Sequence, residues 1–429
     1  MRNIKSLGLA AICIFSYSFL FLLRGIAIPQ EEIPQHKPEK PEYQSSNNCK
    51  GCHPGIYKYW SNSMHANSIS DPVFQVAYAK AITNYGVKIR EFCLSCHSPT
   101  TAITKDFDLK NPVSKEGVTC DFCHTVTNVI EGKPKNSFEV QLGDTKFGPL
   151  DGVEPIGGLE FRYSALHKSA KLCAGCHELE SENGVKILGT YSEWKDSPYA
   201  RKGIQCQNCH MPELLDVPVV SPTVKPTSNM AHAHEFLGGH SQVRLEKAAS
   251  VAMTTKREKN RILVDVYVTN EEAGHCLPTG LPTRKVVLTV SLKDEQGQVI
   301  SSKEVVYEKV LSDKDGNNIT AVECAMVEPV ALKSDNRIKP KETRHEQLQF
   351  ENIQEGIHYL VTANLRYKFE VAVLERNVMT VDMANSAKVV SGETNGGPGY
   401  EWVIPLGASF LIVIIFIAIL VYGRARKVN

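Results

Sequence analysis

Hydrophobic residues are distributed in three ways along the 429-residue chain. Both ends are almost continuously apolar, residues 248–385 alternate between apolar and polar positions, and residues 48–247 show only weak helical periodicity. Alternation is typical of strands with one buried face, whereas a long continuous apolar run can cross a membrane. The pattern therefore divides the chain into terminal segments, an irregular domain and a strand domain.

The two apolar ends predict membrane-directed segments. Residues 1–27 join the basic start MRNIK to a long apolar run, which predicts a signal peptide or an N-terminal anchor. Residues 402–423 carry no charge and are longer than the about 20 residues that span a bilayer, so they predict a C-terminal transmembrane helix. The basic tail 424–429 is then cytoplasmic by the positive-inside rule. We expect a bacterial cytoplasmic membrane protein whose main domains are periplasmic.

Residues 248–385 predict an antiparallel sandwich of immunoglobulin type. SVAMTTKREKNRILVDVYVTN contains two alternating runs around a Lys-Asn turn, and KVVLTVSLKDEQGQVISSKEVVYEKV predicts a hairpin around EQGQ. RHEQLQFENI and HYLVTANLRYKFEVAV are two further candidate strands. Residues 386–400 are expected to be a flexible linker.

The segment before the strand domain has two parts. Residues 28–47 are rich in Pro, Glu, Lys and Gln and predict a disordered tether, because they cannot bury enough apolar surface to fold. Residues 48–247 contain one clear helix, DPVFQVAYAKAITNYG, in which Asp71 can cap the amino end and Pro72 fits the first turn. Long irregular joints are expected elsewhere in this domain.

Composition excludes one class of partner. The 48 Lys and Arg nearly balance the 47 Asp and Glu, which leaves a net charge of +1, and the hydrophobic share of 42% is ordinary for a globular protein. Because no basic excess attracts phosphate groups, nucleic acid is not an expected partner.

Ten of the thirteen cysteines fall into five CxxCH pentads, the signature of c-type haem attachment. In such a site the two thiols bind the porphyrin covalently and the adjacent histidine ligates the iron. Zinc sites and disulfides do not require a histidine directly after the second cysteine, yet all five pairs have one. The sequence therefore predicts five covalently bound haem c groups, attached through Cys49 and Cys52, Cys93 and Cys96, Cys120 and Cys123, Cys173 and Cys176, and Cys206 and Cys209, with proximal ligands His53, His97, His124, His177 and His210.

The pentads lie within residues 49–210, which leaves few residues to surround each haem. The haems are therefore expected to pack against one another and to form the core of a mainly helical or irregular domain. Close packing also gives an electron a route between irons. The predicted fold class is this multihaem cytochrome domain, then an immunoglobulin-like sandwich, then a transmembrane helix.

Six further histidines are candidates for the distal position on the irons. Five lie near a pentad in the sequence, and the sixth, His275, lies in EEAGHCLPTG of the strand domain, where it is either a ligand or part of a turn that joins two strands. The candidate set is His65, His167, His232, His234, His240 and His275.

An internal repeat relates the two halves of the pentad region. GIYKYWSNSMHA (55–66) aligns with GTYSEWKDSPYA (189–200), and EGVTCDFCH resembles KGIQCQNCH. Tyr199 occupies the place of His65. The paired aromatic residues of each copy are expected to pack on haem faces.

These motifs resemble a known family. CKGCHPGIYKYWSNSMHA, YSEWKDSPYARKGIQCQNCHMP and HAHEFLGGH are similar to segments of multihaem cytochromes c related to the tetrahaem cytochrome of nitrifying bacteria and to hydroxylamine oxidoreductase. The resemblance implies that His65, His167 and either His232 or His234 are distal ligands. The chain departs from related enzymes: it has no CxxCK motif and only five pentads, where hydroxylamine oxidoreductase has eight haems.

Two functions are compatible with these features. The favoured one is a membrane-anchored pentahaem cytochrome c that carries electrons on the periplasmic side, with a quinol-linked donor, a soluble cytochrome acceptor and the lipid bilayer as partners; no catalytic residue is then assigned. The alternative is an oxidoreductase that acts on a small nitrogen or sulfur species at one haem with an open axial position. Cys276 and Cys324 are expected to form a disulfide or to remain buried thiols.

Overall fold

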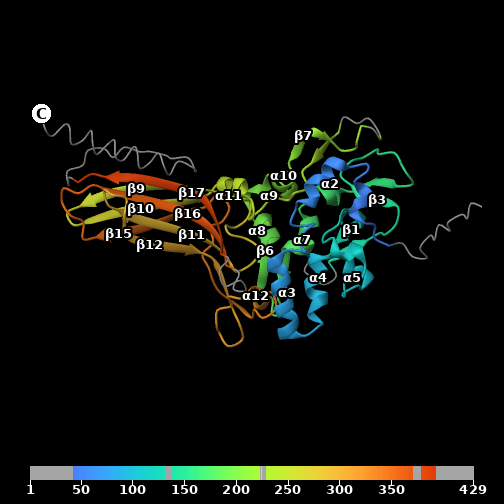
Figure 1. Cartoon of the computed structure of the whole chain (residues 1–429), viewed down its shortest axis with the longest axis horizontal. Coiled ribbons are helices and arrows are strands. Elements are labelled where there is room, and N and C mark those ends of the chain that lie inside the picture. Colours follow the sequence, from blue (N-terminus) through green and yellow to red (C-terminus); the bar gives the residue numbers. More distant parts are fainter. Residues whose placement is uncertain (1–41, 132–136, 223, 225–228, 371–377, 393–429) are drawn as a thin grey trace, which may run out of the picture. The chain divides into compact units, whose positions relative to one another are not determined.

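The computed structural model describes residues 42–131, 137–222, 224, 229–370 and 378–392. In Figure 1 the blue-to-green part of the chain carries most of the helices, and the yellow-to-red part carries the long strands.

Most pentads lie on short helices. Four of them lie on α4, α6, α7 and α10, and the first pentad begins at the last residue of η1 and ends just before α2. The elements are η1 Ser46–Cys49, α2 Pro54–Ser61, α3 Pro72–Tyr85, α4 Ile89–His97, α5 Thr100–Thr104, η2 Pro112–Lys115, α6 Cys120–Thr125, η3 Ala165–Lys168, α7 Lys171–His177, α8 Thr190–Lys195, α9 Pro198–Arg201 and α10 Cys206–His210.

The predicted helix after residue 70 is confirmed as α3. The Asp71 carboxylate accepts the N–H of Phe74 at 2.9 Å, and Pro72 occupies the first turn, where no intrahelical donor is needed. Gly86 follows with a φ of 78°, a conformation that glycine adopts without strain, and the helix ends there.

The pentad region also contains eight short strands, which corrects the expectation of a mainly helical or irregular domain. They pair as β1 with β2, β3 with β4, β5 with β6 and β7 with β8. The segments between the helices therefore pair with one another, and this pairing satisfies many of their backbone N–H and carbonyl groups. The strands are β1 Val126–Val129, β2 Phe138–Val140, β3 Thr145–Gly148, β4 Glu160–Tyr163, β5 Glu178–Glu180, β6 Lys186–Gly189, β7 Glu213–Pro218 and β8 Met230–His232.

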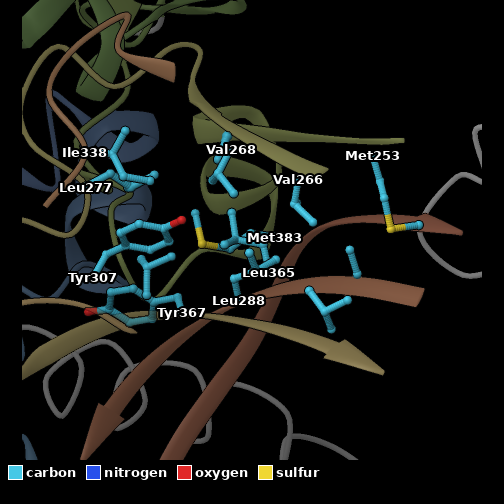
Figure 2. Close-up of a cluster of buried hydrophobic side chains, with 14 of the residues drawn as sticks. Met253, Val266, Val268, Leu277, Leu288, Tyr307, Ile338, Leu365, Tyr367 and Met383 are labelled. Atoms are coloured by element: carbon cyan, nitrogen blue, oxygen red, sulfur yellow. The ribbon is translucent and has the colours of Figure 1, made fainter. Parts of the chain in front are cut away.

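In the described residues, the core of the strand domain lies between two antiparallel sheets with the orders β15-β10-β9 and β12-β11-β16-β17. The predicted hairpins β9–β10 and β11–β12 are both present. Val266, Val268, Leu288, Leu365 and Met383 from both sheets are in the buried cluster shown in Figure 2. The elements are α11 Gln242–Ala248, β9 Ala249–Glu258, β10 Arg261–Asn270, β11 Arg284–Lys293, β12 Val299–Tyr307, β15 Thr343–Glu351, β16 Tyr359–Glu370 and β17 Val378–Val390.

Two observed boundaries differ from the predicted ones. Strand β17 continues to Val390, because its residues pair with β16 as far as Tyr359. At the other end, Glu42–Asn47 belongs to the predicted tether, yet Tyr43 is only 6% exposed and packs near Phe122. A single buried aromatic residue in a polar segment gives no periodic signal, so the pattern of residues 28–47 does not indicate this contact.

A long excursion between β12 and β15 contacts the pentad region. It contains β13 Lys309–Ser312, α12 Val322–Ala325 and β14 Ala331–Asp335. Leu311 shares a buried cluster with Leu179 and Ile187. The Lys309 ammonium donates a hydrogen bond to the Ile187 carbonyl at 2.7 Å. The strand domain and the pentad region are thus joined by apolar and polar contacts.

The predicted transmembrane helix and membrane location are corrected. None of the helices in the described residues has the length and hydrophobicity that a membrane crossing requires, and the longest of them, α3, has 14 residues. The segments 1–27, 402–423 and 424–429 lie outside the described residues.

Candidate haem sites

Four pentad histidines share one hydrogen-bonding pattern. In each, ring nitrogen Nδ1 lies against a backbone carbonyl oxygen from a distant part of the chain. A hydrogen bond donated by Nδ1 selects the tautomer whose Nε2 has a free lone pair, which is the state that ligates a metal. The pairs are His53 with Val219 at 2.6 Å, His97 with Ser68 at 3.1 Å, His124 with Phe147 at 2.7 Å and His210 with Leu237 at 2.6 Å.

Three pentad histidines lie opposite a second histidine. The ring centroids are 5.5 Å apart for His124 and His167, 6.2 Å for His177 and His65, and 6.4 Å for His210 and His275. Two imidazoles on opposite sides of one metal, each with a bond of about 2 Å, place their centroids roughly 6 Å apart. These three pairs therefore fit a haem iron between two histidines.

His167 has an unsatisfied nitrogen that supports this fit. Its Nε2 lies 2.9 Å from the Cys123 carbonyl, whereas its buried Nδ1 has no hydrogen-bond partner. A buried polar atom without a partner is costly, and ligation of a metal would satisfy it. The free nitrogen of His167 is thus Nδ1.

Burial favours the neutral form of several of these histidines. It lowers the pKa of His65 to about 3 and the pKa values of His167, His210 and His234 to about 4, because a charged imidazolium is poorly solvated there. A neutral imidazole retains the lone pair that binds iron. Burial also lowers the pKa values of His97, His124, His177, His240 and His275.

The remaining three candidate histidines have different surroundings. His234 is half-buried and has His53 among its electrostatic neighbours. His232 and His240 are exposed; the Asp71 carboxylate lies near His240 and also near His97. The sequence did not distinguish His232 from His234, whereas the structure separates them by burial.

Thiols from different pentads contact one another. A hydrogen bond with Cys120 lowers the pKa of Cys49. Corresponding contacts join Cys96 to Cys176 and Cys173 to Cys206. The first pentad therefore neighbours the third, and the fourth neighbours both the second and the fifth.

The described residues contain neither a disulfide nor a side-chain cluster that could hold a bare metal ion. All cysteines in the described residues are free thiols, including Cys276 and Cys324, so the disulfide considered for that pair does not form. The described residues also contain no group of three His, Cys, Asp or Glu arranged around a bare metal ion.

The internal repeat is visible in the hydrogen bonds. Trp60 Nε1 donates to the Val118 carbonyl at 2.9 Å, and Trp194 Nε1 donates to the Ile204 carbonyl at 2.8 Å. Each acceptor lies two residues before the first cysteine of a pentad. The turn glycines match as well, because Gly117 has a φ of 74° and Gly203 a φ of 73°. The expected packing of these aromatic residues on haem faces stays a prediction.

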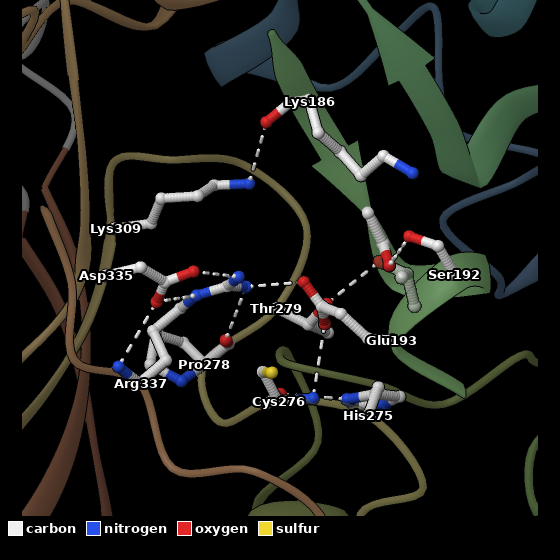
Figure 3. A network of polar contacts seen from close by, with 12 residues as sticks. Lys186, Ser192, Glu193, His275, Cys276, Pro278, Thr279, Lys309, Asp335 and Arg337 are labelled. Atoms are coloured by element: carbon white, nitrogen blue, oxygen red, sulfur yellow. Dashed lines mark hydrogen bonds and ion pairs between the residues drawn. The ribbon is translucent and has the colours of Figure 1, made fainter. Parts of the chain in front are cut away.

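The second copy of the repeat contacts the strand domain. The Tyr199 hydroxyl donates to the Glu271 carbonyl at 3.0 Å. The Glu193 carboxylate accepts hydrogen bonds from the Cys276 N–H and the Thr279 hydroxyl, and it pairs with Arg337 (Figure 3). Although burial raises the pKa of Glu193, Arg337 outweighs it and holds this pKa below its usual value. Neither Glu193 nor Arg337 belongs to a CxxCH pentad, so the haem-attachment pattern did not predict their contact.

Comparisons with known proteins agree with the pentads. The family model described as cytochrome c554 and c-prime matches residues 48–125. A penta-haem cytochrome c552 from Thermochromatium tepidum has a TM-score of 0.65 and 24% identity, with 82% of this chain and 100% of that chain covered. This likeness shows a shared fold. A putative beta-galactosidase from Bacteroides fragilis has a TM-score of only 0.18 and 14% identity, with 34% of this chain and 17% of that chain covered.

No curated protein matches the chain. The relation to hydroxylamine oxidoreductase is not confirmed by the comparisons and stays a prediction. The five pentads, the family match over residues 48–125 and the shared fold support a multihaem cytochrome c that carries electrons.

Proposed function

We propose that this protein is a pentahaem electron carrier whose irons are ligated by histidine pairs. The observation that carries the proposal is the facing of three pentad histidines by a second histidine at 5.5 to 6.4 Å. Bound haem supplies reversible one-electron chemistry. The cysteines of the five pentads would hold the groups, and His53, His97, His124, His177 and His210 would be their proximal ligands.

The distal ligands follow from the same geometry. His65 serves the iron of His177, His167 serves that of His124, and His275 serves that of His210. These ligands come from outside the pentad that they serve. Each haem would therefore join two parts of the chain.

The remaining two irons are assigned from weaker contacts. His234 is half-buried and has His124 and His53 among its electrostatic neighbours. Because His167 already lies opposite His124, we assign His234 to the first pentad. His240 shares the neighbouring Asp71 with His97, so we assign it to the second pentad. His232 is exposed and is left without an iron.

Contacts between pentads support an electron route through the domain. The thiol contacts connect the first pentad to the third and the fourth to the second and the fifth. Redox proteins are the corresponding partners, and a quinol-linked donor and a soluble cytochrome acceptor are proposed. The net charge of +1 does not favour a particular donor or acceptor among redox proteins.

A second candidate function is an oxidoreductase that binds a small nitrogen or sulfur species at the second pentad. Among the described residues, the ring that lies against His97 is Phe74, at a centroid distance of 3.9 Å, and the assigned His240 is exposed. Of the five haems, the one at His97 is therefore the one for which the structure gives least support to a second histidine ligand.

Electron paramagnetic resonance of the oxidised, haem-loaded protein tests both functions. The carrier predicts five haems per chain by pyridine haemochrome assay and only low-spin signals, unchanged by nitrite, hydroxylamine or cyanide. A high-spin signal that shifts with these molecules supports the second function instead. Fewer than five haems per chain contradicts the pentahaem assignment.

A further inference from the structure

We propose that the buried ion pair of Glu193 and Arg337 positions His275, so that the strand domain controls axial ligation of the haem attached at Cys206 and Cys209. The inference rests on the proposed function, because it takes His275 as a distal ligand. Glu193 and Arg337 are positioning residues, since neither contacts the ring of His275 or of His210 in the structure.

Glu193 holds the residue that orients the imidazole. Its Oε2 accepts the N–H of Cys276 at 3.1 Å, and His275 Nδ1 lies 3.0 Å from the carbonyl oxygen of the same Cys276 (Figure 3). Donation from Nδ1 leaves Nε2 free to ligate iron. Glu193 therefore fixes, through one residue, both the direction and the tautomer of the ring.

The peptide group between His275 and Cys276 is held at both ends. Its N–H donates to Glu193, and its oxygen accepts a hydrogen bond from the Asn270 side-chain amide at 3.0 Å. Asn270 is fully buried and also donates to the Ile338 carbonyl at 3.1 Å. The backbone that carries His275 thus has little freedom to rotate.

The guanidinium of Arg337 is held in place by Asp335 as well as by Glu193. Asp335 binds its guanidinium twice, at 2.8 Å and 2.7 Å, and Arg337 Nη1 pairs with Glu193 Oε1 at 2.7 Å. The side chains of Arg337 and Glu193 are only 7% and 10% exposed. Replacement of Glu193 by alanine would leave Arg337 paired with Asp335 alone, and the Cys276 N–H and the Thr279 hydroxyl would lose their acceptor.

The repeat gives an independent reason to connect Glu193 with ligation. In the first copy, the positions of Glu193 and Tyr199 are occupied by Tyr59 and His65. His65 lies opposite the pentad histidine His177, whereas both residues of the second copy contact residues 271–279 of the strand domain. The second copy therefore lacks a ligand of its own at this place and holds the segment that supplies one.

The test uses the full-length, haem-loaded protein and its variants Glu193→Ala, Glu193→Gln and His275→Ala. The readouts are the high-spin signal in paramagnetic resonance and the rate of cyanide binding. Glu193→Ala is expected to make one haem bind cyanide on the order of tenfold faster, because loss of support around a metal ligand typically weakens the site by that factor. Glu193→Gln keeps an acceptor oxygen for Cys276 or Thr279 and is expected to show a smaller increase.

Asp382→Ala is the matched control. Asp382 pairs with Arg366 at 2.7 Å in the same domain, but both side chains are largely exposed. This variant is expected to bind cyanide at the parent rate. If Glu193→Ala does not fold, Thr279→Val removes one hydrogen bond of the same carboxylate and keeps the ion pair, and it is expected to increase the cyanide rate by a smaller factor.

Two outcomes separate the inference from the function on which it rests. If His275→Ala leaves every haem low-spin, His275 is no ligand and its part in the proposed function fails. If His275→Ala creates a high-spin haem but Glu193→Ala and Thr279→Val bind cyanide at the parent rate, His275 is a ligand and the positioning role of Glu193 is wrong.

Discussion

The imidazole rings of His210 and His275 lie 6.4 Å apart with their planes inclined by 17°, although one belongs to the last pentad and the other to a loop of the strand domain. In the proposed function this relationship would place the ligands of one haem on both domains. A haem held by both would add a further link to the apolar and polar contacts that already join them. The strand domain is thus more than an appended module in the proposed function.

Substitution at His234 and His232 tests how the two neighbouring candidates differ. His234→Ala is expected to convert one low-spin haem to high-spin, because the half-buried ring is the assigned ligand of the first pentad. His232→Ala is the matched control and should leave the spectrum unchanged, since its ring is exposed. A high-spin haem in His232→Ala and none in His234→Ala would reverse the assignment.

Tyr199→Phe should weaken the protein without changing ligation. It removes the hydrogen bond from the Tyr199 hydroxyl to the Glu271 carbonyl, which typically stabilises a fold by about 1 kcal/mol. Urea unfolding of the haem-loaded protein measures the loss, and paramagnetic resonance should show the parent signals. Tyr163→Phe serves as the control, because Tyr163 is exposed. A changed spin state in Tyr199→Phe would mean that Tyr199 acts on a haem.

The buried pair of Asp121 and Lys146 is expected to stabilise the third pentad. Asp121 is 3% exposed, pairs with Lys146 at 2.5 Å and accepts the N–H of Gln44 at 2.8 Å. Asp121→Asn leaves the Lys146 charge unpaired and should lower the free energy of unfolding by about 3 to 5 kcal/mol.

Asp108→Asn is the control for that measurement. Asp108 pairs with Arg90 at 2.7 Å but is 56% exposed, and such pairs contribute about 0 to 1 kcal/mol. If Asp121→Asn and Asp108→Asn lower the free energy of unfolding by equal amounts, the burial of Asp121 does not strengthen its ion pair.

Stability should fall in acid partly because of His65. Burial lowers its folded-state pKa to about 3, from an ordinary value of 6.5. Between these values the unfolded chain binds a proton that the folded chain does not, so the stabilising contribution is complete above pH 6.5 and is lost as pH falls towards 3.

Urea midpoints measured at several pH values across that window check the prediction. His65→Gln cannot take up this proton, but it also removes a proposed iron ligand and so changes the midpoint at every pH. The slope of the midpoint against pH is therefore compared, and it should be less steep for His65→Gln than for the parent protein. Identical slopes for the two proteins would exclude His65 as a contributor.

Local patterns predicted much of the fold. Asp71 and Pro72 predicted where α3 begins, because a capping residue and a proline in the first turn are both local signals in the sequence. Alternation of apolar and polar positions placed β9 and β10, since a strand that buries one face repeats every two residues, as the burial along β10 does. The short ladders between the pentads were missed, because strands of three to six residues have too few positions to show a period.

The amino-acid sequence by itself determined the haem-attachment chemistry, because the two thiols and the histidine of each CxxCH pentad lie within five consecutive residues. Only the tertiary structure decided which candidate histidines lie opposite three of the pentad histidines, and that Glu193 pairs with Arg337 and accepts a hydrogen bond from Cys276, the residue after His275. These relationships join residues far apart in the chain. They depend on packing and burial, which no local spacing encodes.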